Sequence, residues 1–420
     1  MKTVIIGIDG APFGLMKDLS DSGVMPNFKK LRQKGTFKQL RSTIPEISSI
    51  SWSSVITGKN AGEHGIFGFV DMIPKTYSLS FPNFKNLKAE PFWKKDNKRY
   101  IILNVPQTYP AQELKGVLIS GFVALDLENS LYPKVFLKKL NELDYKIDVD
   151  SNKAHKSMDL FLKELFEVLE ARINTANYFW KEADWDTFML VFTGTDRLMH
   201  FLWEAYEDKA HKYHQQFLEV FKKIDQFLGT IDQEKYNLIM LSDHGFEKLE
   251  TEVNINTFLE KKGFLSLDKE KKSYAAITDK TKAFSLDPAR IFINLKGKYP
   301  NGSIEESEKE KIIQELTREF EKLEYKGEKV IKKIYKKEEI YKGEYTKNAP
   351  DLVLLANKGF DLKSKLNKEK IFEKGIFTGK HSYPDAFLFV NIPESSKIVP
   401  DNPCVEDVTK IIKALENETS

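Results

Sequence analysis

The chain has 420 residues, of which 41% are hydrophobic and 30% charged, as is ordinary for a soluble globular protein. Lysine and arginine together number 65 against 62 acidic residues, so the net charge of +3 gives no electrostatic case for nucleic acid as the main partner. No run of about 18 apolar residues occurs, so we expect no membrane span. The single cysteine excludes an internal disulfide and fits a reducing, cytoplasmic location.

Short apolar runs alternate with amphipathic stretches, which predicts an α/β fold with a central, mostly parallel sheet and helices on both faces. The expected elements are, in chain order, a strand at 3–8, helices at 26–34 and 49–56, strands at 99–104 and 117–122, a helix at 161–179, a strand at 187–192, helix over 201–228 with a break near 208, and a strand at 236–241.

The character of the chain changes after Gly245. Residues 265–350 are rich in lysine and glutamate and contain a long charged helix at 305–323, which predicts a smaller inserted lobe. Strand patterns return at 351–355 and 386–391, and a last helix is expected at 405–415. The predicted catalytic core therefore comprises 1–264 and 351–420.

Three aspartates follow the ends of predicted strands. Asp9 ends the first strand, Asp196 follows the strand at 187–192, and Asp243 follows the strand at 236–241. Sites in sheets of this kind form at the carboxyl ends of the strands, so these side chains are candidates for one shared site. The alternative for each aspartate is a cap on the next helix.

Histidines stand close to two of these aspartates. Asp196 and His200 are four apart, which places them on one face of a helix, and Asp243 and His244 share a turn. His381 lies in a predicted polar loop before the strand at 386–391. Mixed aspartate and histidine ligands suit zinc, manganese or iron more than calcium or magnesium. Taken singly, each element also fits a surface pair, an ordinary turn or a loop histidine.

The segment 42–58 is dense in hydroxyl groups, with a turn at Pro45 and a helix after it. A serine at the N-cap of that helix, where unpaired N–H groups and the positive end of the dipole lie, can act as a nucleophile beside a bound phosphate. A capping turn rich in serine is the alternative.

Together these pieces follow the chain order of the alkaline phosphatase superfamily and most resemble its type I phosphodiesterase/nucleotide pyrophosphatase branch. The motifs that carry the resemblance are Gly7-Ile8-Asp9-Gly10, Met25-Pro26-Asn27-Phe28, Pro45 to Gly58, Leu241-Ser242-Asp243-His244-Gly245-Phe246 and Thr378-Gly379-Lys380-His381. The family nucleophile lies ten residues before the glycine of a Thr-Gly pair, and counting back from Gly58 reaches Ser48.

The resemblance implies hydrolysis of phosphate esters of small molecules, with phosphodiester or nucleotide pyrophosphate bonds favoured, through a phosphoserine on Ser48. It also implies two divalent metal ions, zinc or alternatively manganese. One ion would be held by Asp9, Asp243, His244 and the oxygen of Ser48, and the other by Asp196, His200 and His381.

One position departs from the family. The nucleotide pyrophosphatases place a phosphoryl-binding asparagine where this chain has Phe69, which leaves the choice between monoester and diester open. The alternatives are therefore a phosphomonoesterase, an enzyme like phosphoglycerate mutase, and a non-catalytic metal-binding relative. A dinucleotide-binding protein is disfavoured because Gly7, Gly10 and Gly14 lack the G-x-G-x-x-G spacing.

Overall fold

The computed structural model describes residues 1–271, 273–366, 368–393 and 397–418. The chain forms two compact units, each built from separate segments. Unit 1 comprises Met1–Lys59, Asn83–Lys248 and Ile376–Ser420, and unit 2 comprises Asn60–Pro82 and Leu249–Gly375. The predicted lobe at 265–350 lies within unit 2, which also takes in residues on both sides of it.

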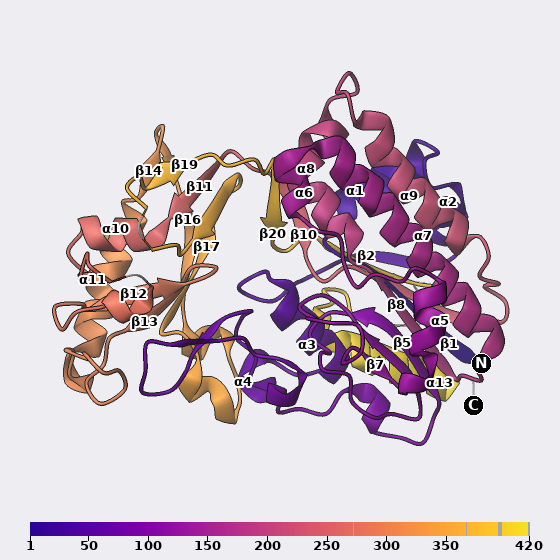
Figure 1. Ribbon diagram of the computed structural model, residues 1–420, viewed down its shortest axis with the longest axis horizontal. Helices are drawn as coiled ribbons and strands as arrows, with labels where there is room; N and C mark the ends of the chain where they lie inside the picture. The colour runs from indigo at the N-terminus through magenta and orange to yellow at the C-terminus, as the bar shows by residue number, and fades with distance from the viewer. Residues whose placement is uncertain (272, 367, 394–396, 419–420) are drawn as a thin grey trace. The chain divides into compact units, whose positions relative to one another are not determined.

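Unit 1 is built on an eight-stranded sheet in the order β2-β21-β9-β1-β8-β5-β6-β7 (Figure 1). The strands are β1 (Lys2–Ile8), β2 (Thr36–Leu40), β5 (Tyr100–Val105), β6 (Gly116–Ser120), β7 (Leu131–Tyr132), β8 (Thr187–Phe192), β9 (Tyr236–Leu241) and β21 (Ala386–Val390). The five strands from β9 to β6 run parallel, and the three toward the edges are antiparallel to their neighbours. The expected mostly parallel sheet is confirmed.

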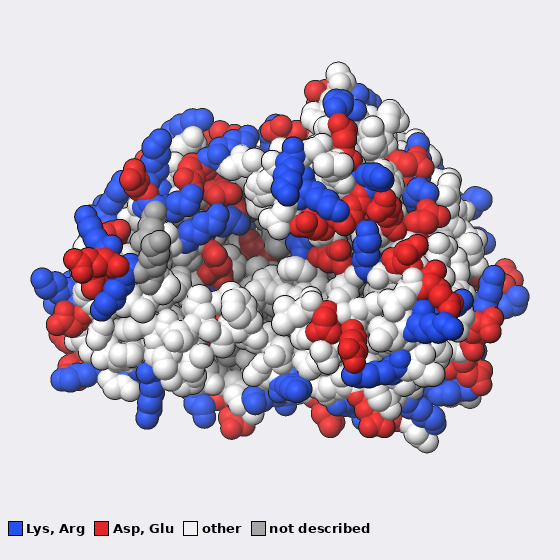
Figure 2. Space-filling view, in the orientation of Figure 1, with Lys and Arg blue, Asp and Glu red and all other residues white. Residues whose placement is uncertain are grey.

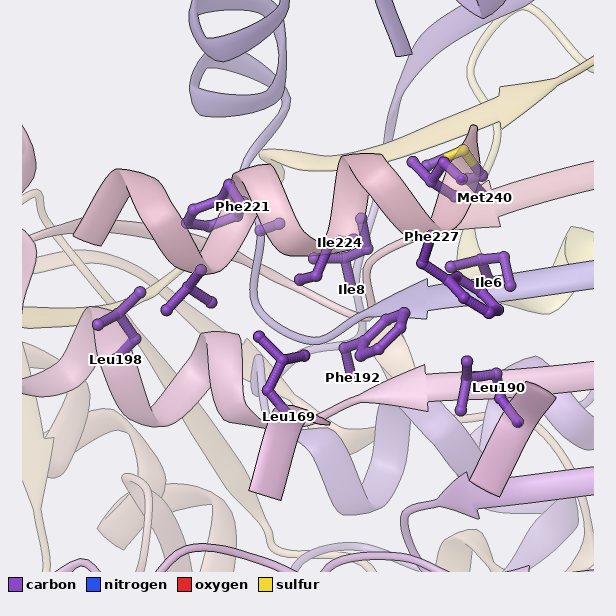
Figure 3. Close-up of a cluster of buried hydrophobic side chains, with 14 of the residues drawn as sticks. Ile6, Ile8, Leu169, Leu190, Phe192, Leu198, Phe221, Ile224, Phe227 and Met240 are labelled. Atoms are coloured by element: carbon purple, nitrogen blue, oxygen red, sulfur yellow. The ribbon is translucent and has the colours of Figure 1, made fainter. Parts of the chain in front are cut away.

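Helices cover both faces of this sheet. They are α1 (Phe13–Asp21), α2 (Pro26–Arg32), α3 (Ser48–Thr57), α5 (Leu137–Glu142), α6 (Asn152–Lys156), α7 (Met158–Glu182), α8 (Gly194–Glu207), α9 (His214–Leu228) and α13 (Val408–Glu418). Side chains alternate along a strand, so Ile6 and Ile8 of β1 pack with α7, α8 and α9 (Figure 3). Ile5 faces the opposite way, into a core shared with α3 and α13.

Unit 2 has its own core around a four-stranded antiparallel sheet in the order β12-β13-β17-β16. Its strands and helices are α4 (Ala61–His64), β3 (Asp71–Met72), β4 (Leu79–Ser80), β11 (Thr251–Asn254), α10 (Ile255–Lys261), β12 (Ala283–Leu286), β13 (Arg290–Ile293), α11 (Lys309–Glu321), β14 (Glu324–Tyr325), β15 (Glu328–Lys329), β16 (Ile331–Lys336), α12 (Lys337–Ile340), β17 (Leu352–Ala356), β18 (Phe360–Lys363) and β19 (Phe372–Glu373). The strand expected at 351–355 is β17, which pairs inside this unit.

Two local predictions are wrong. His381 lies not in a loop but in β20 (Gly379–Ser382), which pairs antiparallel with β10 (Gly245–Lys248). The sequence also predicted a serine at the N-cap of the helix after Pro45, but Ser48 is the first residue of α3 and the N-cap is Ile47.

The helical stretch expected at 201–228 is two helices that separate at Asp208, close to the predicted break. In the part of the chain that the structure describes, no helix is long and apolar enough to cross a membrane.

Candidate active site

The register of the central strands brings the first candidate ligands together. Within the parallel ladders Ile8 lies beside Phe192, and Gly7 lies beside Leu241. The residues that follow these strands therefore leave the sheet side by side, at the carboxyl ends of the strands. Asp9 and Asp243 meet there, and the Gly10 N–H donates to Oδ1 of Asp243 at 3.1 Å.

The first group of candidate ligands comprises Asp9, Ser48, Asp243 and His244, all buried. Nε2 of His244 lies 3.3 Å from Oδ2 of Asp243, 3.8 Å from Oδ1 of Asp9 and 3.1 Å from Oγ of Ser48. Oδ1 of Asp9 and Oδ2 of Asp243 are buried with no hydrogen-bond donor among the described residues. Two buried carboxylate oxygens without donors suit a cation between them.

The second group comprises Asp196, His200 and His381. Asp196 and His200 lie one turn apart on α8, and β20 brings His381 to them. Nε2 of His381 is 3.1 Å from Oδ1 of Asp196 and 3.0 Å from Nε2 of His200, and Nε2 of His200 is 3.5 Å from the same Asp196 oxygen. All seven candidates therefore lie in unit 1, in two adjoining groups that meet where the rings of His244 and His381 stack at 3.7 Å.

Backbone carbonyls orient all three imidazoles. Nδ1 lies 3.1 Å from the Gly245 carbonyl in His244, 3.2 Å from the Gly379 carbonyl in His200, and 2.9 Å from the Glu46 carbonyl in His381. Because a carbonyl oxygen only accepts, each Nδ1 carries a proton and a neutral ring presents a lone pair at Nε2. The Nε2 atoms of His200 and His381 lie 3.0 Å apart, and in their neutral forms both rings would present lone pairs to a shared cation.

The pKa values of the carboxyl groups of Asp9 and Asp196 are shifted in opposite directions. Burial, followed by the negative charge of Asp243, raises the pKa of Asp9 well above its usual range. Burial also acts to raise the pKa of Asp196, but His200, His381 and Arg197 outweigh it and the pKa of Asp196 is lowered. Burial lowers the pKa of His244, which favours its neutral, ligating form.

Among the described residues, two groups of three have ligand atoms within 4.8 Å of one another, and His244 belongs to both. The groups are Asp9, Asp243 and His244, and Asp196, His244 and His381. Carboxylate oxygens and imidazole nitrogens at such spacing form a donor set suited to zinc or another transition metal. The residues present thus fit divalent metal ions.

Several residues around the site were not predicted from the sequence. Nε1 of Trp52 donates to Oδ2 of Asp9 at 3.0 Å, and Arg197 bridges Asp196 to Asp148. Adjacency to Asp196 was the one signal in the sequence for Arg197, whereas Asp148 lies 49 residues away from it. Phe69, in the position where the family has an asparagine, belongs to unit 2.

A mostly parallel α/β sheet that gathers carboxylates, imidazoles and a serine hydroxyl at its carboxyl edge defines a class of protein, the hydrolases of the alkaline phosphatase superfamily. The family model described as type I phosphodiesterase / nucleotide pyrophosphatase matches residues 3–384. The chain belongs to this family, as its motifs predicted, and is a hydrolase acting on phosphate ester bonds. The family's enzymes use divalent metal ions.

Solved structures share the fold over the full chain. Phosphonoacetate hydrolase from Sinorhizobium meliloti 1021 is 13% identical, with 99% of this chain and 95% of that chain covered and a TM-score of 0.66. Murine and human ectonucleotide pyrophosphatase/phosphodiesterase 5 are each 14% identical over the same shares, with TM-scores of 0.56 and 0.57. No curated protein sequence matches the chain.

Proposed function

We propose that this enzyme hydrolyses phosphodiester or nucleotide pyrophosphate bonds of small molecules through a phosphoserine on Ser48. Asp9, Asp243, His244 and Ser48 hold one divalent cation, and Asp196, His200 and His381 hold the other. Zinc is the proposed metal, with manganese as the alternative. The observation that carries the proposal is the convergence of three imidazole Nε2 atoms on three buried carboxylates. Nε2 of His244 faces the oxygens of Asp9 and Asp243 that lack donors among the described residues, and Nε2 of His200 and of His381 face Oδ1 of Asp196.

In this proposal Ser48 attacks phosphorus. It is the first residue of α3, whose first N–H groups lack partners within the helix and favour a negatively charged phosphoryl group beside them. Bond formation from Oγ to phosphorus accompanies breakage of the bond to the leaving oxygen, and water then cleaves the phosphoserine. When bound, two divalent cations neutralise the charge that develops on the phosphoryl oxygens.

A small substrate agrees with two further observations. The structural neighbours were solved with phosphonoacetate and with AMP, both of which are small molecules. On the face shown in Figure 2, acidic and basic side chains of the described residues are interspersed, which differs from the single-sign field of a nucleic-acid-binding surface.

The deciding experiment is a hydrolysis panel of p-nitrophenyl phosphate, bis-p-nitrophenyl phosphate and nucleotide pyrophosphates, each measured with zinc and with manganese. We expect the diester and the nucleotide substrates to be cleaved fastest. A preference for the monoester would favour a phosphomonoesterase. No turnover of any substrate by protein that holds metal would favour a non-catalytic relative.

Ser48→Ala should lower kcat by roughly three or more orders of magnitude, because the nucleophile is lost, while the bound metal content stays nearly unchanged. The matched control is Ser49→Ala, since Oγ of Ser49 is buried in the same helix with no partner among the described residues. Near-full activity of Ser48→Ala would refute the nucleophile, and equal loss in both variants would point to a structural effect.

A further inference from the structure

We propose that Arg197 and Asp148 act as a positioning pair that aims one oxygen of Asp196 at the second metal ion. This inference rests on the proposed function, because it assigns a role toward a cation held by Asp196, His200 and His381. Neither Arg197 nor Asp148 belongs to the proposed ligands.

The contacts form a chain from Asp148 to the candidate ligand. Arg197 donates from Nε at 3.2 Å and from Nη2 at 3.0 Å to Oδ2 of Asp148, and from Nη1 at 3.1 Å to Oδ2 of Asp196. The Val149 N–H donates to Oδ1 of Asp148 at 2.9 Å. Both oxygens of Asp148 are therefore engaged, so this carboxylate is itself held in place.

The same contacts give the two oxygens of Asp196 different partners. Oδ2 is engaged by Arg197, while Oδ1 lies 3.1 Å and 3.5 Å from the Nε2 atoms of His381 and His200. A carboxylate free to rotate would exchange its two oxygens at the cation. With Oδ2 held, the side chain presents Oδ1 in one orientation, which lowers the entropy lost when the ion binds.

Packing and charge support a positioning role. The guanidinium of Arg197 lies over the ring of Phe122 at 4.1 Å, and the side chains of Arg197 and Asp148 are each only 16% exposed. A lone guanidinium beside a divalent ion would repel it. Asp148 balances that charge, so the pair supplies a rigid hydrogen bond to Asp196 at little electrostatic cost.

The sign of the effect distinguishes positioning from charge. If Arg197 acted through its charge alone, its removal would make zinc bind more tightly. If it positions Asp196, its removal makes zinc bind more weakly, even though a repulsive charge has gone. Asp148→Asn removes the balancing charge and loosens the guanidinium, so the pair predicts weaker binding there too.

The test measures zinc affinity of the purified enzyme by chelator competition for wild type, Arg197→Met, Arg197→Lys and Asp148→Asn. We expect the weaker-bound zinc to lose about 10–100-fold in affinity in Arg197→Met and Asp148→Asn, with a partial recovery in Arg197→Lys. Visible spectra of the cobalt-substituted proteins should change in the same variants, because the geometry at Asp196 changes.

The matched control is Arg99→Met. Arg99 forms a similar fork with Asp186, but at the opposite end of β8, and its loss should leave zinc affinity unchanged. Zinc binding as tight as or tighter than wild type in Arg197→Met overturns the pair. If Arg197→Met does not fold, Arg197→Lys decides the question, because it keeps the positive charge and loses the planar fork; zinc affinity equal to wild type in that variant overturns the pair. Wild-type enzyme that binds no zinc or manganese overturns the proposed function instead.

Discussion

Asp9 shows how the surroundings of one residue suit it to a cation. The indole of Trp52 donates to Oδ2, while Oδ1 has no donor among the described residues. Burial and the charge of Asp243 raise the pKa of Asp9, so in metal-free protein the ionised form is disfavoured. The folded state then binds a proton more tightly than the unfolded chain does, and stability falls as the pH rises from the ordinary carboxyl range toward the raised pKa.

Asp9→Asn should therefore stabilise the metal-free protein and abolish its response to zinc at the first site. A buried polar atom without a partner costs about 1–3 kcal/mol, which sets the scale of the gain. Thermal melts in chelator over a pH series check this, because the amide variant should lose the decline in stability with rising pH. Equal melting curves for both proteins at every pH would count against the environment inferred for Asp9.

The pairing of β20 with β10 is the element that completes the second group, because it places His381 opposite Phe246. Gly379 begins β20 and packs closely on α8, where an added Cβ would lie 2.4 Å from the Met199 carbonyl oxygen. The carbonyl of Gly379 also orients His200. This glycine thus links the strand that carries one ligand to the helix that carries two.

Gly379→Ala should cost roughly 1–3 kcal/mol of stability and weaken metal binding at Asp196, His200 and His381, because backbone atoms must move apart. Chemical denaturation and zinc titration measure the two effects. Gly14→Ala, in α1, is the control, since its Cβ meets nothing within 4 Å and we expect equal or higher stability. Unchanged zinc affinity in Gly379→Ala would show that the strand tolerates displacement.

The elements differ in how far the sequence predicts them. β8 and β9 match the expected residues, since their buried apolar runs are clear. β20 was missed because Gly-Lys-His-Ser has no apolar alternation and its partner lies more than a hundred residues earlier in the chain. The contact between Arg197 and Asp148 also could not be predicted, because the two residues are 49 positions apart and no sequence pattern links them.

At the scale of the whole molecule, the candidate ligands run from Asp9 to His381 yet gather in unit 1. Strand ends and spacing suggested a shared site, but the two ligand sets came from family resemblance, since sequence spacing does not report distances between segments so far apart. The full extent of unit 2 could not be predicted from the sequence either, because it depends on which distant strands pair. The pairing of β17 with β13 and β16 joins residues outside 265–350 to those within it.

Removal of metal should lower the melting temperature of the whole enzyme, because the ions bind the folded arrangement of distant segments and not the unfolded chain. Free metal at a hundred times its dissociation constant stabilises a protein by about 2.7 kcal/mol per site. Calorimetry before and after chelation, and again after zinc is restored, measures this. Identical melting in all three states would mean that the ligands do not join around metal.

The edge of the sheet in unit 1 has a consequence for biosynthesis. β2, near the start of the chain, has its sheet neighbour in β21, and β21 separates it from β9. A nascent polypeptide that has reached only residue 370 thus exposes two unpaired strand edges and lacks His381. The ribosome must release β21 before these strands can join, so hydrolytic competence arises only after residue 390 has been made.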